Sequence, residues 1–193
     1  MRHRKPQSIV VVWIAPVALT EQETPMNDSL APLFRRLMSG VCVVGVSNGQ
    51  RQNAFTAAWI MQISFDPLLL ALTINPDHAS YQLLKDGGSF VVNVLSREQL
   101  DIARHFGTHS GRDFDKLAGV QWRAGRLGAP ILSEALAYFE CQVADSMRAG
   151  DHEIIVGRVL DGAILEPDAI PLAYAETGDL DGSSELYPAR FSN

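Results

Sequence analysis

The stretch Asn53-Ala54-Phe55-Thr56-Ala57-Ala58-Trp59 decides the fold of this chain. It follows the turn signal Asn48-Gly49 and precedes a second strand-like run at residues 68–74. A strand that only packs a core favours Val, Ile and other bulky side chains, whereas this one carries small and hydroxylated residues. The sequence therefore predicts a strand that leaves room for a flat molecule and offers hydrogen bonds to it.

The segments on either side of this stretch predict mostly antiparallel strands. The Asn48-Gly49 pair is typical of a two-residue hairpin turn, so residues 41–47 should pair with the strand that follows. Further strands are expected at 90–95, 137–147 and 153–165, with turns at 65–67, 75–77 and 149–151. Because βαβ alternation is absent, a Rossmann sheet is disfavoured and a closed or nearly closed barrel is expected.

Short helices are expected between the strands. Ser29 or Asp28 should cap a helix that ends at Gly40, and Ser80 should cap another that ends at Gly87-Gly88. Ser96 and Gln99 have the spacing of a capping box, and residues 113–117 suggest one more helical turn. The first of these helices should place four apolar residues on one face: Leu33, Phe34, Leu37 and Met38.

Several other segments follow the first in a shared order and spacing. They are Gly88-Ser89-Phe90-Val91-Val92-Asn93-Val94-Leu95, Ala103-Arg104-His105-Phe106-Gly107, Gly128-Ala129-Pro130-Ile131-Leu132 and Gly150-Asp151-His152. With them, the chain resembles the flavin reductase family from about residue 33 to about residue 164, somewhat toward its flavoredoxin branch. The resemblance implies a mainly β FMN-binding split barrel, a homodimer, and reduction of flavin by NADH or NADPH on a tightly held FMN.

The candidate site combines this resemblance with the chemistry of the residues. Thr56, Ala57 and Ala58 leave space for an isoalloxazine ring, and a helix start at Ser80 attracts a phosphate. The resemblance places His152 beside the flavin and the nicotinamide. The expected cofactor-binding residues are Asn53, Ala54, Phe55, Thr56, Ala57, Ala58, His78, Ser80, Tyr81, Arg104, Phe106 and His152.

Several residues in these segments also have a purely structural interpretation. Trp59 and Phe106 have the pattern of core residues, Ser80 that of an N-cap, and His152 that of an exposed turn residue. No obligatory catalytic side chain is expected, because in flavin reduction the cofactor carries the reaction.

Other function classes lack their signals. The net charge is −6, and no Lys/Arg cluster occurs beyond the first five residues, which argues against nucleic-acid binding. The chain has no GxGxxG or GxxxxGK[ST] loop, no GxSxG elbow and no Cys/His spacing typical of a metal site. The two cysteines, Cys42 and Cys141, lie in apolar runs and are expected to be buried thiols in a reducing cytoplasm.

The domain organisation is predicted in three parts. Residues 1–25 have basic and apolar regions like those of a signal peptide, yet the apolar run at 9–19 is too short to span a membrane, and the segment is interpreted as an extension from an upstream start. Residues 26–166 form the split-barrel domain and residues 167–193 a C-terminal arm. The expected function is an NAD(P)H:flavin oxidoreductase that supplies reduced flavin to a partner monooxygenase; the alternatives are a flavoredoxin-like electron carrier and a flavin store or sensor.

Overall fold

The computed structural model describes residues 30–112, 114–188 and 191. The expectations for residues 1–25 and for a cap at Asp28 or Ser29 lie outside these residues. One antiparallel sheet forms the body of the protein, with strand order β2-β1-β5-β8-β9-β4-β3. Its strands are β1 (Cys42–Ser47), β2 (Gln52–Ala57), β3 (Ile60–Phe65), β4 (Leu68–Ile74), β5 (Ser89–Val94), β8 (Ala137–Ala149) and β9 (His152–Ile164).

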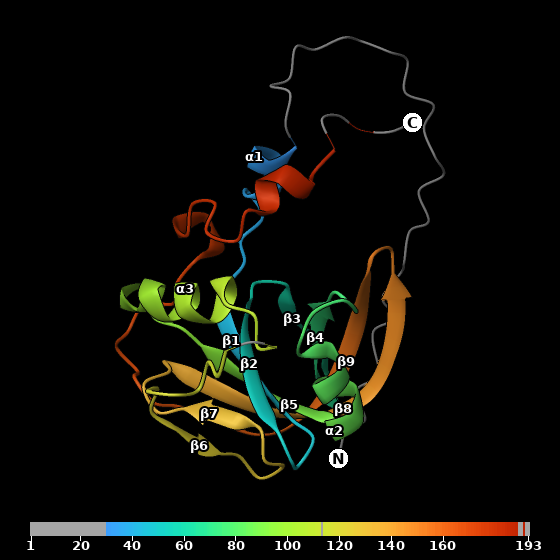
Figure 1. Cartoon of the computed structure of the whole chain (residues 1–193), viewed down its shortest axis with the longest axis vertical. Coiled ribbons are helices and arrows are strands. Elements are labelled where there is room, and N and C mark those ends of the chain that lie inside the picture. Colours follow the sequence, from blue (N-terminus) through green and yellow to red (C-terminus); the bar gives the residue numbers. More distant parts are fainter. Residues whose placement is uncertain (1–29, 113, 189–190, 192–193) are drawn as a thin grey trace, which may run out of the picture.

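The sheet forms a split barrel (Figure 1). Its two edge strands, β2 and β3, are consecutive in the chain and are joined by Ala58 and Trp59. The predicted mainly β split barrel is confirmed, but the sheet is not closed, since β2 and β3 are not hydrogen-bonded neighbours in it. The expected strand at 53–59 is correspondingly shorter, because the chain leaves β2 after Ala57 to cross to the other edge.

Local turn chemistry sets the register of the first hairpin. Asn48 Oδ1 accepts hydrogen bonds from the backbone N–H groups of Gln50 (3.1 Å) and Arg51 (2.9 Å). Gly49 has φ +84°, a conformation that favours glycine. The predicted pairing of residues 41–47 with β2 is confirmed, and it brings Ala57 opposite Cys42 and Gln52 opposite Ser47.

Strand β3 was not predicted as a separate element. It pairs with β4 and contains a bulge, because the register shifts between Gln62 and Ser64. Most of its side chains are exposed, so its sequence lacks the strict alternation of a half-buried strand.

The alternation of side chains along the strands divides the core into two large clusters and a smaller third one. One large cluster contains Val44, Phe55 and Phe90, and the other contains Val43, Ala54 and Phe106. A small second sheet, β6 (Trp122–Ala124) with β7 (Pro130–Leu132), lies against β1 so closely that a Cβ on Gly45 would be 2.3 Å from the carbonyl oxygen of Pro130. Glycine is therefore required at this crossing.

The predicted helices around the sheet are found, with one exception. α2 (Tyr81–Gly87) ends at Gly88 with φ +61°, and Gln99 Oε1 accepts from Ser96 N (2.9 Å) before η1 (Arg97–Gln99) and α3 (Leu100–Thr108). α3 packs against β2. The helical turn expected at 113–117 is wrong for its described residues, 114–117, which form no helix.

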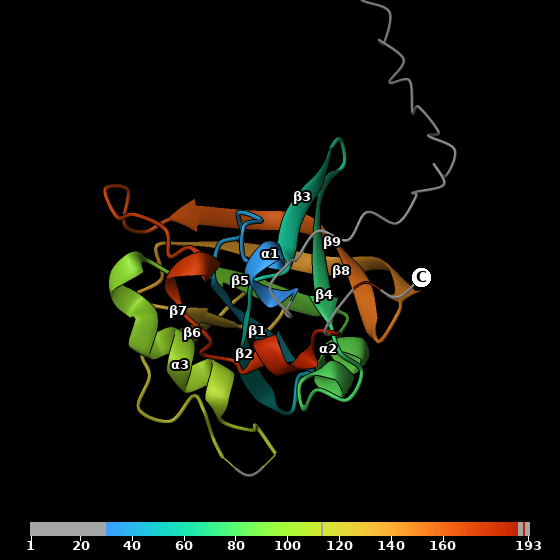
Figure 2. The same cartoon turned by 90° about the horizontal axis from the view of Figure 1, so that it is seen from above.

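The first helix differs from its prediction. α1 (Ala31–Phe34) has a single turn, in which Ala31 is buried but Leu33 and Phe34 are exposed, and Met38, which was expected on the same helix, lies beyond it and is 95% exposed. The reason is its position, because α1 stands at one end of the barrel instead of lying on the sheet (Figures 1 and 2). It lies there beside the C-terminal arm, which contains η2 (Tyr174–Glu176) and η3 (Ser183–Leu186).

No helix among the described residues has the length and apolar character needed to cross a membrane.

Candidate functional site

The predicted site residues lie around edge strand β2. Asn53 is buried at its start, and Asn53 Nδ2 donates a hydrogen bond to Ser80 Oγ (3.0 Å). The backbone N–H of Ser80 donates to Nδ1 of His78 (3.1 Å). The structure thus joins Asn53, His78 and Ser80 in one chain of hydrogen bonds, although Ser80 is separated from Asn53 by two strands.

This chain of hydrogen bonds fixes the state of His78. Because Nδ1 accepts a hydrogen bond from a backbone amide, the neutral ring carries its proton on Nε2. Burial, together with the charges of Lys116 and Arg112, lowers the pKa of His78 to about 4. His78 therefore stays neutral at pH 7, with its ring packed 4.7 Å from that of Phe55.

The Ser80 hydroxyl faces the protein interior. Ser80 is fully buried at the N-cap position of α2, yet its side chain makes no capping hydrogen bond. Its hydroxyl accepts from Asn53 instead. Ser80 thus connects α2 to β2, and its hydroxyl and its amide are both already hydrogen-bonded.

A cationic pocket opens at the start of β2. Its volume is about 660 Å³, within the range of ligand pockets of roughly 300–1,000 Å³. Two arginines and two aromatic residues contribute to its wall, and sequence reasoning missed all four because they come from separate segments. The lining residues are Arg51, Gln52, Asn53, Gly111, Arg112, Phe114, Asp115, Leu117, Ala118 and Trp122.

A buried lysine, Lys116, follows the pocket-lining residue Asp115 in the sequence. Lys116 is 1% exposed, and its Nζ donates to the carbonyl oxygen of Phe106 (3.0 Å). Burial lowers the pKa of Lys116 to about 8. Within the described part of the chain Lys116 forms no ion pair.

A second, smaller cavity lies at the other end of β2. Thr56, Ala57 and Ala58 form one wall, as the sequence predicted for a slot, but the volume is only about 80 Å³. The opposite side is formed by the C-terminal arm. The remaining lining residues are Val41, Gly107, Tyr174, Thr177, Leu180 and Asp181.

Helix α3 holds this wall in place. Thr56 Oγ1 donates to the carbonyl oxygen of Ala103 (2.7 Å), and a Cβ on Gly107 would lie 3.4 Å from Thr56 Cβ. The Thr56 hydroxyl is therefore used to dock α3 on β2. Phe106, on the same helix, is 1% exposed and belongs to the core.

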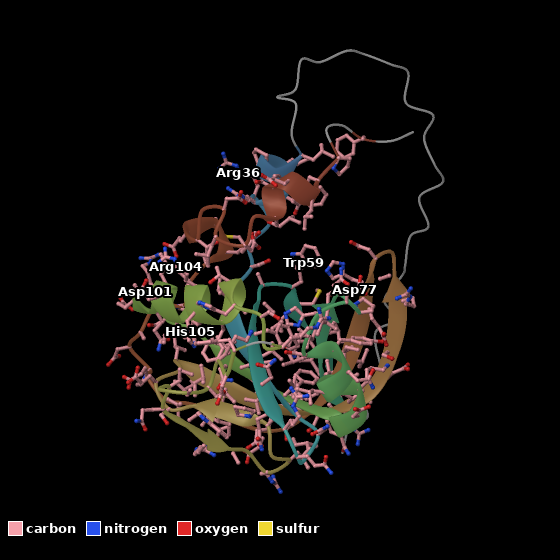
Figure 3. The ribbon with its side chains drawn as sticks, in the orientation of Figure 1. Arg36, Trp59, Asp77, Asp101, Arg104 and His105 are labelled. Carbon is pink, nitrogen blue, oxygen red and sulfur yellow. The ribbon has the colours of Figure 1, made fainter. Side chains whose placement is uncertain are left out.

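Other predicted residues lie away from both cavities. Ala54 and Phe55 are buried in the two core clusters. Arg104 projects from the outer side of α3, where it forms an ion pair with Asp101 (2.8 Å) (Figure 3). No contact in the described structure brings Arg104 to β2.

His152 and Trp59 meet beyond the small cavity. His152 begins β9 after the turn at Gly150, whose φ of +65° favours glycine, and its ring lies 4.9 Å from that of Trp59. His152 Nδ1 lies 2.9 Å from Asp151 Oδ1, and this contact lowers the pKa of the Asp151 carboxyl. Because Trp59 follows Ala58, His152 lies near the end of the predicted slot.

A polar cluster anchors the first residues of β9. Tyr81 donates a short hydrogen bond to Glu153, and Lys85 Nζ lies 2.7 Å from Glu153 Oε1. Hydrogen bonds from Lys85, Ser146 and Tyr81 lower the pKa of Glu153 to about 2. Tyr81 thus helps to fix the residue next to His152, a role that sequence reasoning did not assign.

The fold and the site define a split-barrel protein with a cationic pocket and a small-residue wall on one edge strand. The chain belongs to the family described as flavin reductase like domain, whose model matches residues 34–181.

Individual relatives agree with this assignment. A probable flavin reductase of Rhizobium meliloti (strain 1021) is 38% identical over 132 residues, which cover 68% of this chain and 42% of that protein. The chain therefore spans less than half of this relative, and it spans only about a quarter of some curated flavoproteins that it matches.

Two solved structures extend the similarity to three dimensions. The NADH:FAD oxidoreductase SgcE6 of Streptomyces globisporus C-1027, in complex with NAD and FAD fragments, has a TM-score of 0.71 and 29% identity, covering 84% of this chain and 91% of that chain. A homologue of nitrilotriacetate monooxygenase component B from Mycobacterium thermoresistibile has a TM-score of 0.67 and 27% identity, covering 73% and 78%.

Proposed function

We propose that this protein is an NAD(P)H:flavin oxidoreductase that binds FMN along β2 and supplies reduced flavin to a partner monooxygenase. One observation carries the proposal. Edge strand β2 runs from a cationic pocket at Asn53 to a wall of small side chains at Thr56, Ala57 and Ala58. FMN has the same polarity, with an anionic phosphate at one end and a flat, largely apolar ring at the other.

The residues present fit such a ligand in two respects. Arg51 and Arg112 line the larger pocket, and arginine is well suited to phosphate because its planar fork donates two parallel hydrogen bonds. Ala57 and Ala58 lack bulk, which lets a ring approach the strand. β2 is also an edge strand, so one side of its backbone has no strand neighbour and is available for hydrogen bonds.

When bound, FMN would supply the redox chemistry by accepting a hydride from the nicotinamide. The protein would then contribute position. Trp59 and His152 would border the end of the slot where a nicotinamide ring approaches, and Glu153 would hold His152 there through Tyr81 and Lys85. No protein nucleophile is required.

A homodimer is part of the proposal. Strands β3, β4, β8 and β9 carry exposed apolar side chains, and a groove of about 550 Å³ crosses the last three of these strands. A second copy is the proposed occupant, because an apolar face of this kind is unusual on a monomer and a two-fold contact would cover the same face on both copies. Exposed apolar residues of these four strands include Met61, Phe65, Leu68, Phe139, Leu160 and Ile164.

Sedimentation of wild-type protein and of Leu160→Glu tests this part. We expect a dimer for the wild type and a monomer for the variant, whereas a monomeric wild type would contradict the proposal.

A cytoplasmic location is also proposed, supported by the two buried cysteines, Cys42 and Cys141, which are both free.

An anaerobic titration tests the activity. FMN is added to purified protein, and then NADH or NADPH, while the flavin absorbance is followed. Bleaching by one nicotinamide is expected. Binding of FMN without bleaching by either would replace the proposal with a flavoredoxin-like electron carrier or a flavin store, and absence of FMN binding would reject it.

A further inference from the structure

The start of the C-terminal arm (residues 167–193) is attached to the barrel by backbone hydrogen bonds on either side of Leu172. Leu172 is 1% exposed, its N–H donates to Leu95 O (2.9 Å), and its carbonyl oxygen accepts from Val41 N (2.8 Å). The next contact is a hydrogen bond from Tyr174 N to Ser39 O (2.8 Å). These backbone hydrogen bonds of Leu172 and Tyr174, called the root of the arm, place the following residues directly beside the end of β2.

Beyond this root, the arm covers the wall of small residues. Tyr174, Thr177, Leu180 and Asp181 line the small cavity opposite Thr56, Ala57 and Ala58. The space left between them is about 80 Å³, whereas pockets that enclose ligands have roughly 300–1,000 Å³. A flavin ring therefore does not fit while the arm is in this position.

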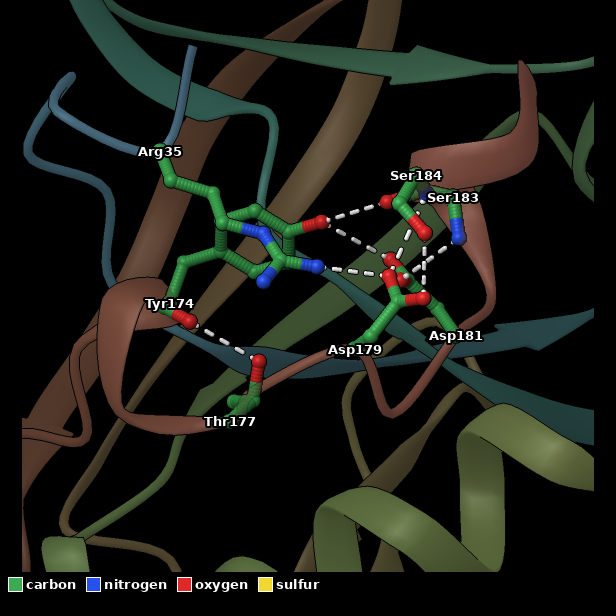
Figure 4. A network of polar contacts seen from close by, with 7 residues as sticks. All are labelled: Arg35, Tyr174, Thr177, Asp179, Asp181, Ser183 and Ser184. Carbon is green, nitrogen blue, oxygen red and sulfur yellow. Dashed lines mark hydrogen bonds and ion pairs between the residues drawn. The ribbon is translucent and has the colours of Figure 1, made fainter. Parts of the chain in front are cut away.

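The covering part of the arm is held by half-buried apolar contacts of Tyr174 and Leu180 with the core cluster that contains Val43 and Phe106, and by an ion pair between Arg97 Nε and Glu176 Oε1 (2.8 Å). Further contacts lie near the surface (Figure 4). Arg35 Nη2 lies 2.6 Å from Asp179 Oδ1, with the two side chains 29% and 41% exposed. Within the arm, Tyr174 Oη lies 2.8 Å from Ser183 Oγ, and beyond it the Phe34 and Tyr187 rings stack at 5.2 Å. Such exposed contacts are weak individually, in contrast to the buried root at Leu172.

We propose that the arm beyond Leu172 is a lid over the flavin slot, latched by the Arg35–Asp179 ion pair. The closed form fills the place that the flavin ring needs, so the lid swings out from Tyr174 when flavin enters. The inference rests on the proposed function, because it assigns the slot at Thr56, Ala57 and Ala58 to the ring. The lid adds to that function a closed conformation, in which the arm occupies the space that the flavin ring needs.

Stopped-flow quenching of riboflavin fluorescence by the full-length protein tests the lid. Riboflavin is neutral, so charge-changing variants do not alter its long-range attraction to the protein. Since the apparent affinity depends on the fraction of open molecules, Arg35→Gln and Asp179→Asn should each raise the association rate and the affinity about two- to fivefold. The double variant should equal either single variant, because both remove the same contact.

Arg36→Gln is the matched control. Arg36 adjoins Arg35, carries the same charge and forms no ion pair with any residue between 30 and 188 that the structure describes. It should behave like the wild type. Latch variants that match Arg36→Gln, or that bind more slowly than the wild type, would overturn the lid while leaving the flavin site intact.

Hydrogen exchange gives a second readout that separates the two proposals. Riboflavin should speed exchange at the amides of residues 174–186 if the arm opens, and slow it if the arm is a permanent wall of the site. Slower exchange would reject the lid only. If neither the wild type nor the latch variants bind riboflavin or FMN, the proposed flavin site fails, and the lid fails with it.

Discussion

The indole ring of Trp59 and the imidazole ring of His152 lie 4.9 Å apart, inclined at 51°. Trp59 belongs to the crossing between the two sheet edges, and His152 to the β8–β9 hairpin. Their contact ties the end of the small-residue wall to the first residue of β9. It is the geometric basis for assigning His152 to the nicotinamide side.

His152→Ala should slow flavin reduction by NAD(P)H about tenfold, equivalent to about 1.4 kcal/mol of transition-state stabilisation. FMN affinity should change only a few-fold, because His152 is separated from the cationic pocket by the length of β2. Single-turnover stopped-flow reduction is the measurement, since flavin release can limit steady-state turnover. Arg148→Ala, an exposed change on the same hairpin, is the control. An unchanged rate would make His152 a surface turn residue, and joint loss of FMN binding would place it in the cofactor site.

Ala58→Leu should weaken binding of riboflavin and FMN tenfold or more. Ala58 lines the small cavity from outside any strand, so added carbons fill the slot without disturbing the sheet. Thr56 is less suitable, because its hydroxyl docks α3. Fluorescence titration measures affinity and circular dichroism measures folding. Ala124→Leu, an exposed change on β6, should leave both unaltered, and normal flavin binding by Ala58→Leu would move the ring elsewhere.

Gly45→Ala should lower the free energy of unfolding by about 1–3 kcal/mol, the usual cost of overpacking. A Cβ there would meet the backbone of Pro130 at 2.3 Å, which only a shift of β7 can relieve. Urea denaturation measures the loss. Gly40→Ala is the matched control, because a Cβ at Gly40 has no atom within 4 Å. Equal stability of the two variants would show that β7 moves freely.

The stability of the protein should fall as the pH drops from 6.5 toward 4. The pKa of His78 is lowered from 6.5 to about 4 by burial and by Lys116 and Arg112. Between these values the unfolded chain binds a proton that the folded protein excludes, so protonation favours unfolding. The contribution of neutral His78 to the free energy of unfolding is therefore fully present above pH 6.5, and it is lost as the pH falls toward the folded pKa of about 4.

His78→Asn should flatten this profile. Its side-chain oxygen can still accept the Ser80 amide two residues on, but it does not titrate. Urea denaturation at pH 7, 6 and 5 is the measurement, above the range in which the carboxylates protonate. A variant that keeps the wild-type slope would assign the dependence to another group.

Contiguous signals made much of the fold predictable. The Asn48-Gly49 hairpin and the Ser96–Gln99 contact depend on neighbouring residues, and both are present. The helix expected before Gly40 shows the limit of this reasoning. An apolar pattern at Leu33 and Leu37 indicates a face to be covered, but the sequence does not say what covers it or whether the sheet lies beneath.

The candidate site was predictable only where it follows one strand. Thr56, Ala57 and Ala58 line a cavity as expected. The cationic pocket was not foreseen, because Arg51, Arg112 and Trp122 converge from three segments and form no motif. For the same reason the arm that covers the slot was expected to be only a surface extension.

The split between β2 and β3 also bears on how the protein avoids aggregation. An open sheet presents unpaired N–H and C=O groups at its edges, and these can recruit strands from other chains. Helix α3 packs against β2, but β3 carries exposed Met61 and Ile63 with neither lysine nor proline in the strand. The bulge between Gln62 and Ser64 interrupts the ladder with β4, and bulges twist an edge away from regular pairing. The bulge therefore limits the length of regular β3 edge with which a strand of another chain can pair.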